Sequence, residues 1–162
     1  MAAKVPEGTK LADKQTLIRN NGTEPSTLDP QLMNGVPESA LGAELFEGLT
    51  ITGANGEILP GVAESWHTDD NKIWVFKLRK DAKWSNGDPV TAHDFVYSFR
   101  RLVNPKTLAP YASYLNYANL VNSAEIASGK KSPESLGVKA LDDYTLELTL
   151  SEVKKYHIYR AY

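Results

Sequence analysis

The sequence contains no cysteine and only three histidines among its 162 residues. The absence of cysteine excludes disulfides and thiolate metal sites, although it does not choose a redox compartment. The histidines His67, His93 and His157 lie far apart in the chain and show none of the spacings of metal ligands. Paired carboxylates occur at 69–70 and 142–143, but adjacent acidic residues in turns are usually solvated turn formers. We therefore expect no metal, no cofactor and no enzymatic centre.

Long apolar runs and a strong net charge are also missing. No stretch approaches the roughly 20 apolar residues of a membrane-spanning helix, and residues 1–4 do not begin the apolar core of a signal peptide. The formal net charge of −2 provides no general attraction to nucleic acid or anionic membranes. The basic residues of 77–83 lie between Trp74 and Trp84, but Asp81 dilutes their charge. We interpret them as a solvated strand face and not as a nucleic-acid surface.

Residues 62–103 carry the clearest structural pattern in a chain that is 41% apolar and 23% charged, as in ordinary globular domains. Within them, residues 72–79 alternate, with Trp74, Phe76 and Leu78 on one face. This period of two residues predicts a strand with one buried face, preceded by another strand and followed by a turn at Asn86-Gly87.

A capped helix follows this turn. Thr91 is a suitable N-cap, and Asp94 three residues later forms an approximate capping box, with Asp in place of the usual Glu or Gln. The apolar residues that follow have helical spacing and predict one buried face: Phe95, Val96, Phe99, Leu102 and Val103. Asn104-Pro105 is expected to end the helix.

The rest of the chain gives shorter patterns. Residues 1–15 are polar and are interpreted as a loosely held arm, and the helix predicted at 38–46 has Leu41, Leu45 and Phe46 as its apolar face. The remaining predicted elements are strands at 16–20, 49–52 and 57–59, a helix at 120–128 and a hairpin at 137–150.

Several of these segments resemble a known family when they are taken in order. They are AESW at 63–66, FKLR at 76–79, WSNGDP at 84–89 and TAHDFVYSFRR at 91–101, with RNNG at 19–22, LDP at 28–30 and LFEGL at 45–49 before them. They resemble the oligopeptide-binding subunits of bacterial ABC importers, in family 5 of the extracellular solute-binding proteins. Within the family, the likeness is to the oligopeptide- and murein-peptide-binding type of enteric bacteria. It runs from about residue 5 to residue 152.

The resemblance implies an α+β fold and corresponds to the N-terminal third of a typical periplasmic-binding-protein-like family member. Residues 1–46 would be the N-terminal segment of a discontinuous and incomplete larger domain. Residues 47–152 would form a compact second domain with a small mixed or antiparallel sheet and packed helices. Residues 153–162 form a basic and aromatic tail that departs from the family pattern. A frameshifted or engineered end and a genuine extra strand are the two interpretations of this tail.

In function, the resemblance implies a periplasmic protein that binds oligopeptides in extended form and delivers them to an inner-membrane ABC permease. From the residues, either the signal peptide has been replaced by an initiator Met or the protein stays in the cytoplasm, and the resemblance favours the first. Two alternatives stay open: a stand-alone interaction or structural module, and a binder of a non-peptide solute, since the wider family includes proteins for nickel and haem.

The resemblance also places peptide contacts at Asn34, Gly35, Val36 and Tyr111. The loop 34–36 would offer backbone groups to the peptide, and the Tyr111 ring would lie against it. Where close relatives often carry an acidic residue, this chain has Asn34, so a contact with basic peptides would be weaker. The structural alternatives are a simple entry into a helix for the loop and core packing for Tyr111.

Two consequences follow if the chain is only part of the binding protein. A peptide held between two jaws loses most of its contacts when one jaw is absent, so we expect the isolated chain to bind peptides weakly or not at all. The strand predicted at 16–20 would lack its sheet neighbours, and an unpaired edge favours pairing with another chain. A homodimer that exchanges these N-terminal arms is therefore a further prediction.

Overall fold

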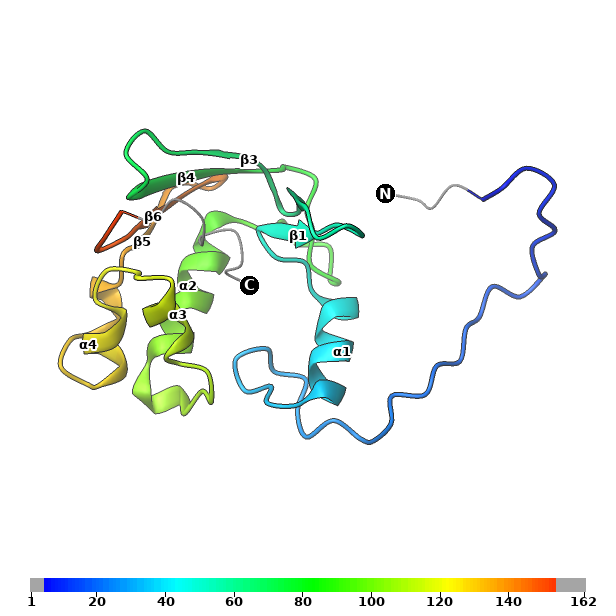
Figure 1. Ribbon diagram of the computed structural model, residues 1–162, viewed down its shortest axis with the longest axis horizontal. Coiled ribbons are helices and arrows are strands. Elements are labelled where there is room, and N and C mark those ends of the chain that lie inside the picture. The colour runs from blue at the N-terminus through cyan, green and yellow to red at the C-terminus, as the bar shows by residue number, and fades with distance from the viewer. Residues whose placement is uncertain (1–4, 154–162) are drawn as a thin grey trace.

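A computed structural model describes residues 5–153, and its centre is a four-stranded antiparallel sheet. The strands are β3 (Ala63–His67), β4 (Ile73–Leu78), β5 (Val138–Asp142) and β6 (Thr145–Thr149), in the spatial order β3-β4-β6-β5. Three α-helices lie on one side of the sheet: α2 (Ala92–Val103), α3 (Tyr114–Tyr117) and α4 (Ser123–Ala127) (Figure 1). Helix and antiparallel sheet thus combine as the α+β prediction requires.

The sheet is buried on the face that the alternation in β4 predicted. Trp74, Phe76 and Leu78 retain at most 3% exposure, whereas Ile73 on the opposite face is 42% exposed. Trp66 of β3 stacks on Phe76, with 6.3 Å between the ring centroids. The core that these residues begin extends from Leu49 to Leu150 and includes side chains from the neighbouring helices.

Helix α2 covers this core and begins as expected. The Asp94 carboxylate accepts the backbone N–H of Thr91 at 2.7 Å, which confirms the capping box with Asp at the third helical position. Phe99 and Val103 are buried against the sheet. The helix ends before Asn104, whose side chain caps the short 3₁₀ helix η1 (Pro105–Thr107).

The C-terminal hairpin is also confirmed. Asp142 accepts the backbone N–H of Tyr144 at 2.8 Å across the turn, and Leu146 and Leu148 of β6 are buried. Helix α4 is shorter than the 120–128 prediction and is followed by Gly129, which has φ +74°. The 3₁₀ helix η2 (Pro133–Ser135) leads from there to β5.

A two-stranded ribbon joins the N-terminal part of the chain to the sheet. Strands β1 (Thr50–Thr52) and β2 (Ile58–Pro60) pair antiparallel, as predicted. The N–H of Val62 donates to the carbonyl of Gly48 at 2.9 Å, just before β3. A Cβ at Gly61 would lie 2.5 Å from the same carbonyl oxygen, so glycine is needed where the two backbones meet.

Helix α1 (Val36–Leu45) matches the predicted helix, but its predicted apolar face is wrong. Leu45 and Phe46 are 60% and 44% exposed, and Leu41 is only partly buried. The buried residue is Glu38, because the 26–33 segment covers the helix only near its start and middle, where Ser26 contacts Glu38 and Met33 lies beside Gly42. Apolar spacing identifies a face that is able to be buried, but a second layer must cover it.

The strand predicted at 16–20 is wrong as well. This part of the chain is extended but forms no strand, and Leu17 and Ile18 are 88% and 94% exposed. It runs away from the body of the molecule (Figure 1). The reason is physical: an extended segment becomes a strand only beside a neighbour that satisfies its backbone. The tail at 154–162 lies outside the described residues.

Replacement of a buried leucine in β6 tests the location of the core. Leu146→Ala removes a side chain with 0% exposure and is expected to lower the free energy of unfolding by about 2–5 kcal/mol. Ile73→Ala, on the 42% exposed face of β4, should cost about 1 kcal/mol or less. Urea unfolding followed by circular dichroism measures both, and equal losses would contradict the one-sided sheet.

Candidate functional site

The predicted contact residues lie in two exposed places. Asn34 is exposed in the loop before α1, Gly35 is the N-cap of this helix, and Val36 is its first residue with 84% exposure. Tyr111 is 53% exposed in the segment between η1 and α3, so the core-packing alternative does not hold for it. No hydrogen bond among the described residues joins Tyr111 directly to the loop. Both places are instead attached to α2.

An ion pair fixes the loop to α2. The Arg101 guanidinium donates to both carboxylate oxygens of Asp29, at 2.6 and 2.5 Å, and also to the side-chain carbonyl of Gln31. The Gln31 amide in turn donates to the hydroxyl of Ser98 at 2.7 Å. The hydrogen bond from Arg101 holds the pKa of Asp29 below its usual range, and the same bond raises the pKa of Arg101. Residues 72 positions apart are therefore held together by paired, opposite charges.

A second contact fixes the start of α1. Glu38 is 6% exposed, and its carboxylate accepts the backbone N–H of Ser26 at 2.7 Å and the Ser26 hydroxyl at 2.8 Å. The backbone N–H of Ser26 is the main cause that lowers the pKa of Glu38. A Cβ at Gly35 would lie 2.5 Å from Oε2 of this carboxylate. A side chain at this position would therefore require the end of the Glu38 side chain to move, whether or not a ligand approaches it.

The backbone after α2 positions Tyr111. The Asn104 side chain accepts the N–H of Lys106 at 3.0 Å, and Leu108 has a left-handed conformation with φ 55° that ends η1. The carbonyl of Tyr111 accepts the N–H of Tyr114 at 2.9 Å, and the Tyr111 side chain lies at the surface. The segment that carries Tyr111 therefore starts from the same helix that holds the loop.

The arrangement offers backbone groups and exposed apolar side chains to a ligand. The loop presents backbone groups beside an exposed valine, and an exposed aromatic ring lies on the other segment. Within residues 5–153, no three His, Cys, Asp or Glu side chains group as they would around a metal ion. Extended ligands are recognised by such backbone groups together with apolar side-chain contacts.

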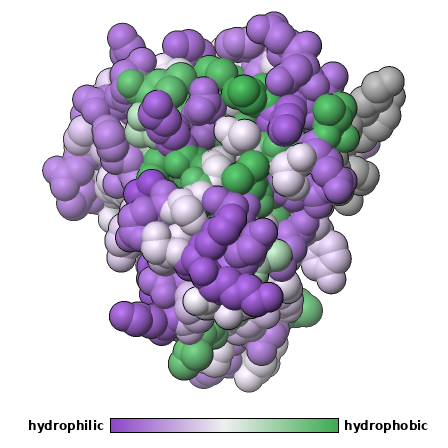
Figure 2. Space-filling model, turned by 90° about the vertical axis from the view of Figure 1, so that its left-hand side faces the viewer, coloured by the Kyte–Doolittle hydropathy of each residue, from purple (hydrophilic) through white to green (hydrophobic). Residues whose placement is uncertain are grey.

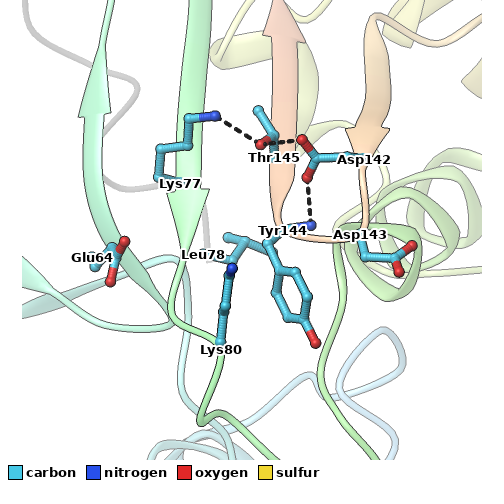
Figure 3. Close-up of a pocket in the computed structure, with 8 residues that line it drawn as sticks. All are labelled: Glu64, Lys77, Leu78, Lys80, Asp142, Asp143, Tyr144 and Thr145. Atoms are coloured by element: carbon cyan, nitrogen blue, oxygen red, sulfur yellow. Dashed lines mark hydrogen bonds between the residues drawn. The ribbon is translucent and has the colours of Figure 1, made fainter.

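A separate pocket of about 410 Å³ lies beside the β5–β6 turn (Figure 3). Lys77 donates to the hydroxyl of Thr145 at 2.9 Å, and this hydroxyl donates to Asp142 at 2.8 Å. Because these groups satisfy one another, we interpret the pocket as part of the turn. The acidic pair 142–143 was interpreted in the same way from the sequence.

The surface seen in Figure 2 has a different character. Apolar side chains gather in the upper half of this face, at the level of the sheet, and hydrophilic residues surround them. The helices beneath present a mostly hydrophilic surface in this view. No helix within the described residues combines the length and the apolarity that a membrane crossing requires.

Sequence reasoning missed Arg101, Gln31 and Glu38 as residues that shape the site. Arg101 lies in the TAHDFVYSFRR segment and Asp29 in the LDP segment, so both were visible as parts of the resemblance. Nothing in the sequence alone pairs residues so far apart.

Comparison with known proteins gives a consistent set of matches. Residues 57–161 match the model of the bacterial extracellular solute-binding proteins, family 5 Middle, a range that includes most of the terminal tail. The periplasmic oligopeptide-binding protein OppA of Salmonella typhimurium is 58% identical over 155 residues, which cover 96% of this chain and 28% of that protein. The periplasmic murein peptide-binding protein MppA of Escherichia coli is 50% identical over 93% of this chain and 28% of that protein.

A solved structure shows the same fold. The crystal structure of Haemophilus influenzae OppA in complex with the peptide RPPGFSPFR superposes with a TM-score of 0.86 and 53% sequence identity. The match covers 91% of this chain and 29% of that one. The chain therefore spans about 28% of the length of the curated relatives described here.

Protonation of Glu38 tests the contact at the start of α1. A carboxylate whose pKa is lowered by folding stabilises the native state above its unfolded pKa, and this contribution is lost as the pH falls through the lowered value. The melting temperature of the wild type should exceed that of Glu38→Gln at pH 7. The difference should shrink below about pH 4.

Glu44→Gln is the matched control, because Glu44 forms an exposed ion pair with Arg19 and its substitution should have little effect on stability at any pH. Thermal unfolding at several pH values measures all three proteins. A Glu38→Gln deficit that is equal at pH 3 and pH 7 would show that the Glu38 charge does not stabilise the fold.

Proposed function

The chain belongs to family 5 of the bacterial extracellular solute-binding proteins, and from this premise we propose that it forms part of the binding surface of a protein that captures extended oligopeptides for an ABC importer. The observation that carries the proposal is the 58% identity, over 96% of this chain, to a protein named for oligopeptide binding. Because the chain spans about 28% of this relative, the activity of the whole protein is part of the proposal.

In this proposal the loop 34–36 pairs with the peptide backbone. Asn34 and Val36 are exposed on either side of Gly35, so an extended chain is able to approach the loop. Main-chain hydrogen bonds of this kind fix a peptide without dictating its side chains. Tyr111 supplies an apolar ring with a polar end against the bound peptide.

The attachments of the loop support this role. Asp29 before the loop 34–36 is held by Arg101, and Glu38 after the loop is bound to Ser26. The loop is therefore fixed at both ends before any ligand arrives. A fixed loop loses less conformational entropy on binding, which raises affinity. The chain supplies one side of the binding surface, and its affinity for peptides on its own is therefore low.

The domain division forms part of the proposal. Residues 1–46 would belong to a discontinuous domain, and residues 47–152 would form a compact domain. The buried apolar residues support this boundary, because all those described lie between Leu49 and Leu150. The exposed apolar side chains of α1, including Leu45, would pack against further parts of the discontinuous domain.

The proposed setting is the periplasm, with an inner-membrane ABC permease as the partner that receives the peptide. The names of the relatives from Salmonella typhimurium and Escherichia coli place both proteins in the periplasm. The role is capture and delivery, without a chemical reaction, a cofactor or a nucleic-acid partner. The alternatives are a stand-alone module and a protein that binds a non-peptide solute. The peptide-binding names of these two relatives favour oligopeptide capture over both alternatives.

A peptide titration tests the proposed surface. The nonapeptide RPPGFSPFR, which the Haemophilus influenzae protein binds, is added at millimolar concentration to the labelled chain, and amide NMR spectra are recorded. We expect a dispersed spectrum with small peptide-induced shifts at residues 34–36 and at Tyr111. Tyr111→Ala should reduce affinity by about tenfold, the size of a contact worth about 1.4 kcal/mol.

Tyr117→Ala is the matched control, because this tyrosine is also exposed, at 75%, but lies outside the predicted contacts. It should leave the shifts unchanged. Shifts that occur elsewhere and spare both predicted places would contradict the proposed surface. A dispersed spectrum that does not respond to the peptide would show that this part of the binding protein folds but does not bind the peptide by itself.

The N-terminal arm gives a separate prediction. Leu17 and Ile18 are exposed in an extended segment, and such a segment is able to pair with a copy of itself. We propose an arm-exchanged homodimer at high protein concentration. Ile18→Pro removes a backbone donor and should shift sedimentation profiles toward the monomer. A dimer that persists after deletion of residues 1–37 would contradict arm exchange.

A further inference from the structure

We infer that Arg101 is a positioning residue for peptide binding, which holds residues 28–36 on α2 and thereby couples the loop contacts to Tyr111. The inference rests on the proposed function, because it assigns a role within the same binding surface. Arg101 itself is not among the residues predicted to touch the peptide. It acts through Asp29 and Gln31, which it binds together.

The contact is specific to a guanidinium. Two parallel N–H groups meet the two carboxylate oxygens of Asp29 at 2.6 and 2.5 Å, and one of them also meets Gln31. The ionic side chains are only 29% and 28% exposed. Lysine carries the same charge but lacks this fork, so it would not fix the orientation of the loop. Ser98, one helical turn before Arg101, adds a second attachment through Gln31.

A turn connects Asp29 to the predicted contact residues 34–36. The carbonyl of Asp29 accepts the N–H groups of Leu32 at 2.9 Å and Met33 at 3.1 Å, which closes a turn immediately before Asn34. The carboxylate of the same residue faces Arg101. A movement of Asp29 therefore moves the turn, and with it the backbone at Asn34.

Helix α2 also links Arg101 to the segment that contains Tyr111. Arg101 lies three residues before Asn104, whose side chain caps η1 and sets the path toward Tyr111. The last turn of one helix thus holds the loop on its side and begins the segment of the aromatic ring. A change at Arg101 should reach both predicted contacts.

Arg101 could instead act only by stabilising helix α2, and this role depends on its charge and not on its two-fold contact with Asp29. Arg101 is also a cation in the last turn of α2, where it stabilises the helix through the macrodipole. Arg101→Lys retains this positive charge and removes the bidentate geometry. The substitution therefore separates the positioning role from support of the helix.

The first measurement is amide hydrogen exchange on the full chain without peptide. In Arg101→Lys we expect the amides of Leu32 and Met33 to exchange about tenfold faster, as for a loss of about 1.4 kcal/mol in local stability. Arg79→Lys is the matched control, because Arg79 also contacts two carboxylates, Glu47 at 2.6 Å and Asp81 at 3.2 Å, neither of which belongs to residues 28–36. It should leave exchange at both amides unchanged.

The second measurement is the titration with RPPGFSPFR. Arg101→Lys should weaken the peptide-induced shifts at residues 34–36 and at Tyr111 by a similar factor, about threefold to tenfold, whereas Arg79→Lys should not. Unchanged exchange at Leu32 and Met33 overturns the inference. If the amides of Leu32 and Met33 exchange faster in Arg101→Lys but the peptide-induced shifts at Tyr111 are unchanged, the coupling between the loop and Tyr111 is overturned. A wild-type chain that does not respond to the peptide shows only that this part of the binding protein does not bind by itself, and the exchange measurement still decides whether Arg101 holds the loop.

Discussion

The pairing of β4 with β6 is the constraint on which the rest of the structure depends. These two strands are about 70 residues apart in sequence, and their register places Phe76 opposite Leu146 and Trp74 opposite Leu148. All four side chains are nearly fully buried. A shift of the register by one residue would turn this apolar face toward water. Helix α2 must cover the face, and the segments before and after α2 are placed by that requirement.

The candidate binding surface depends on this placement. Helix α2 presents its apolar side to the sheet and its polar side, with Ser98 and Arg101, to the 28–33 segment. The core therefore fixes the orientation of the ion pair, and the ion pair fixes the loop. Charged hydrogen bonds at partly exposed positions add little to the global free energy of unfolding, but they hold the local position and orientation of the loop. Orientation is what a surface for extended ligands requires.

Gly35 illustrates how a structural and a functional requirement occupy one residue. The absence of a side chain leaves room for the buried carboxylate of Glu38, and it also leaves the backbone at the loop accessible. The packing of the Glu38 carboxylate accounts for a small residue at this position without any ligand. The role of the loop in binding is consequently supported by the relatives and by the attachment to α2, and not by the glycine.

The sequence by itself determined the local elements and the family. The alternation in β4, the capping box of α2 and the acidic turn between β5 and β6 depend on neighbours within a few residues, so local patterns were sufficient. Helix α1 was placed correctly but its buried face was not, and the strand at 16–20 did not form. Both depend on a covering layer or a paired edge, which local patterns cannot supply. Only the tertiary structure decided that Asp29 meets Arg101 across 72 residues, because such a contact exists only once the sheet and α2 have fixed the path of the chain.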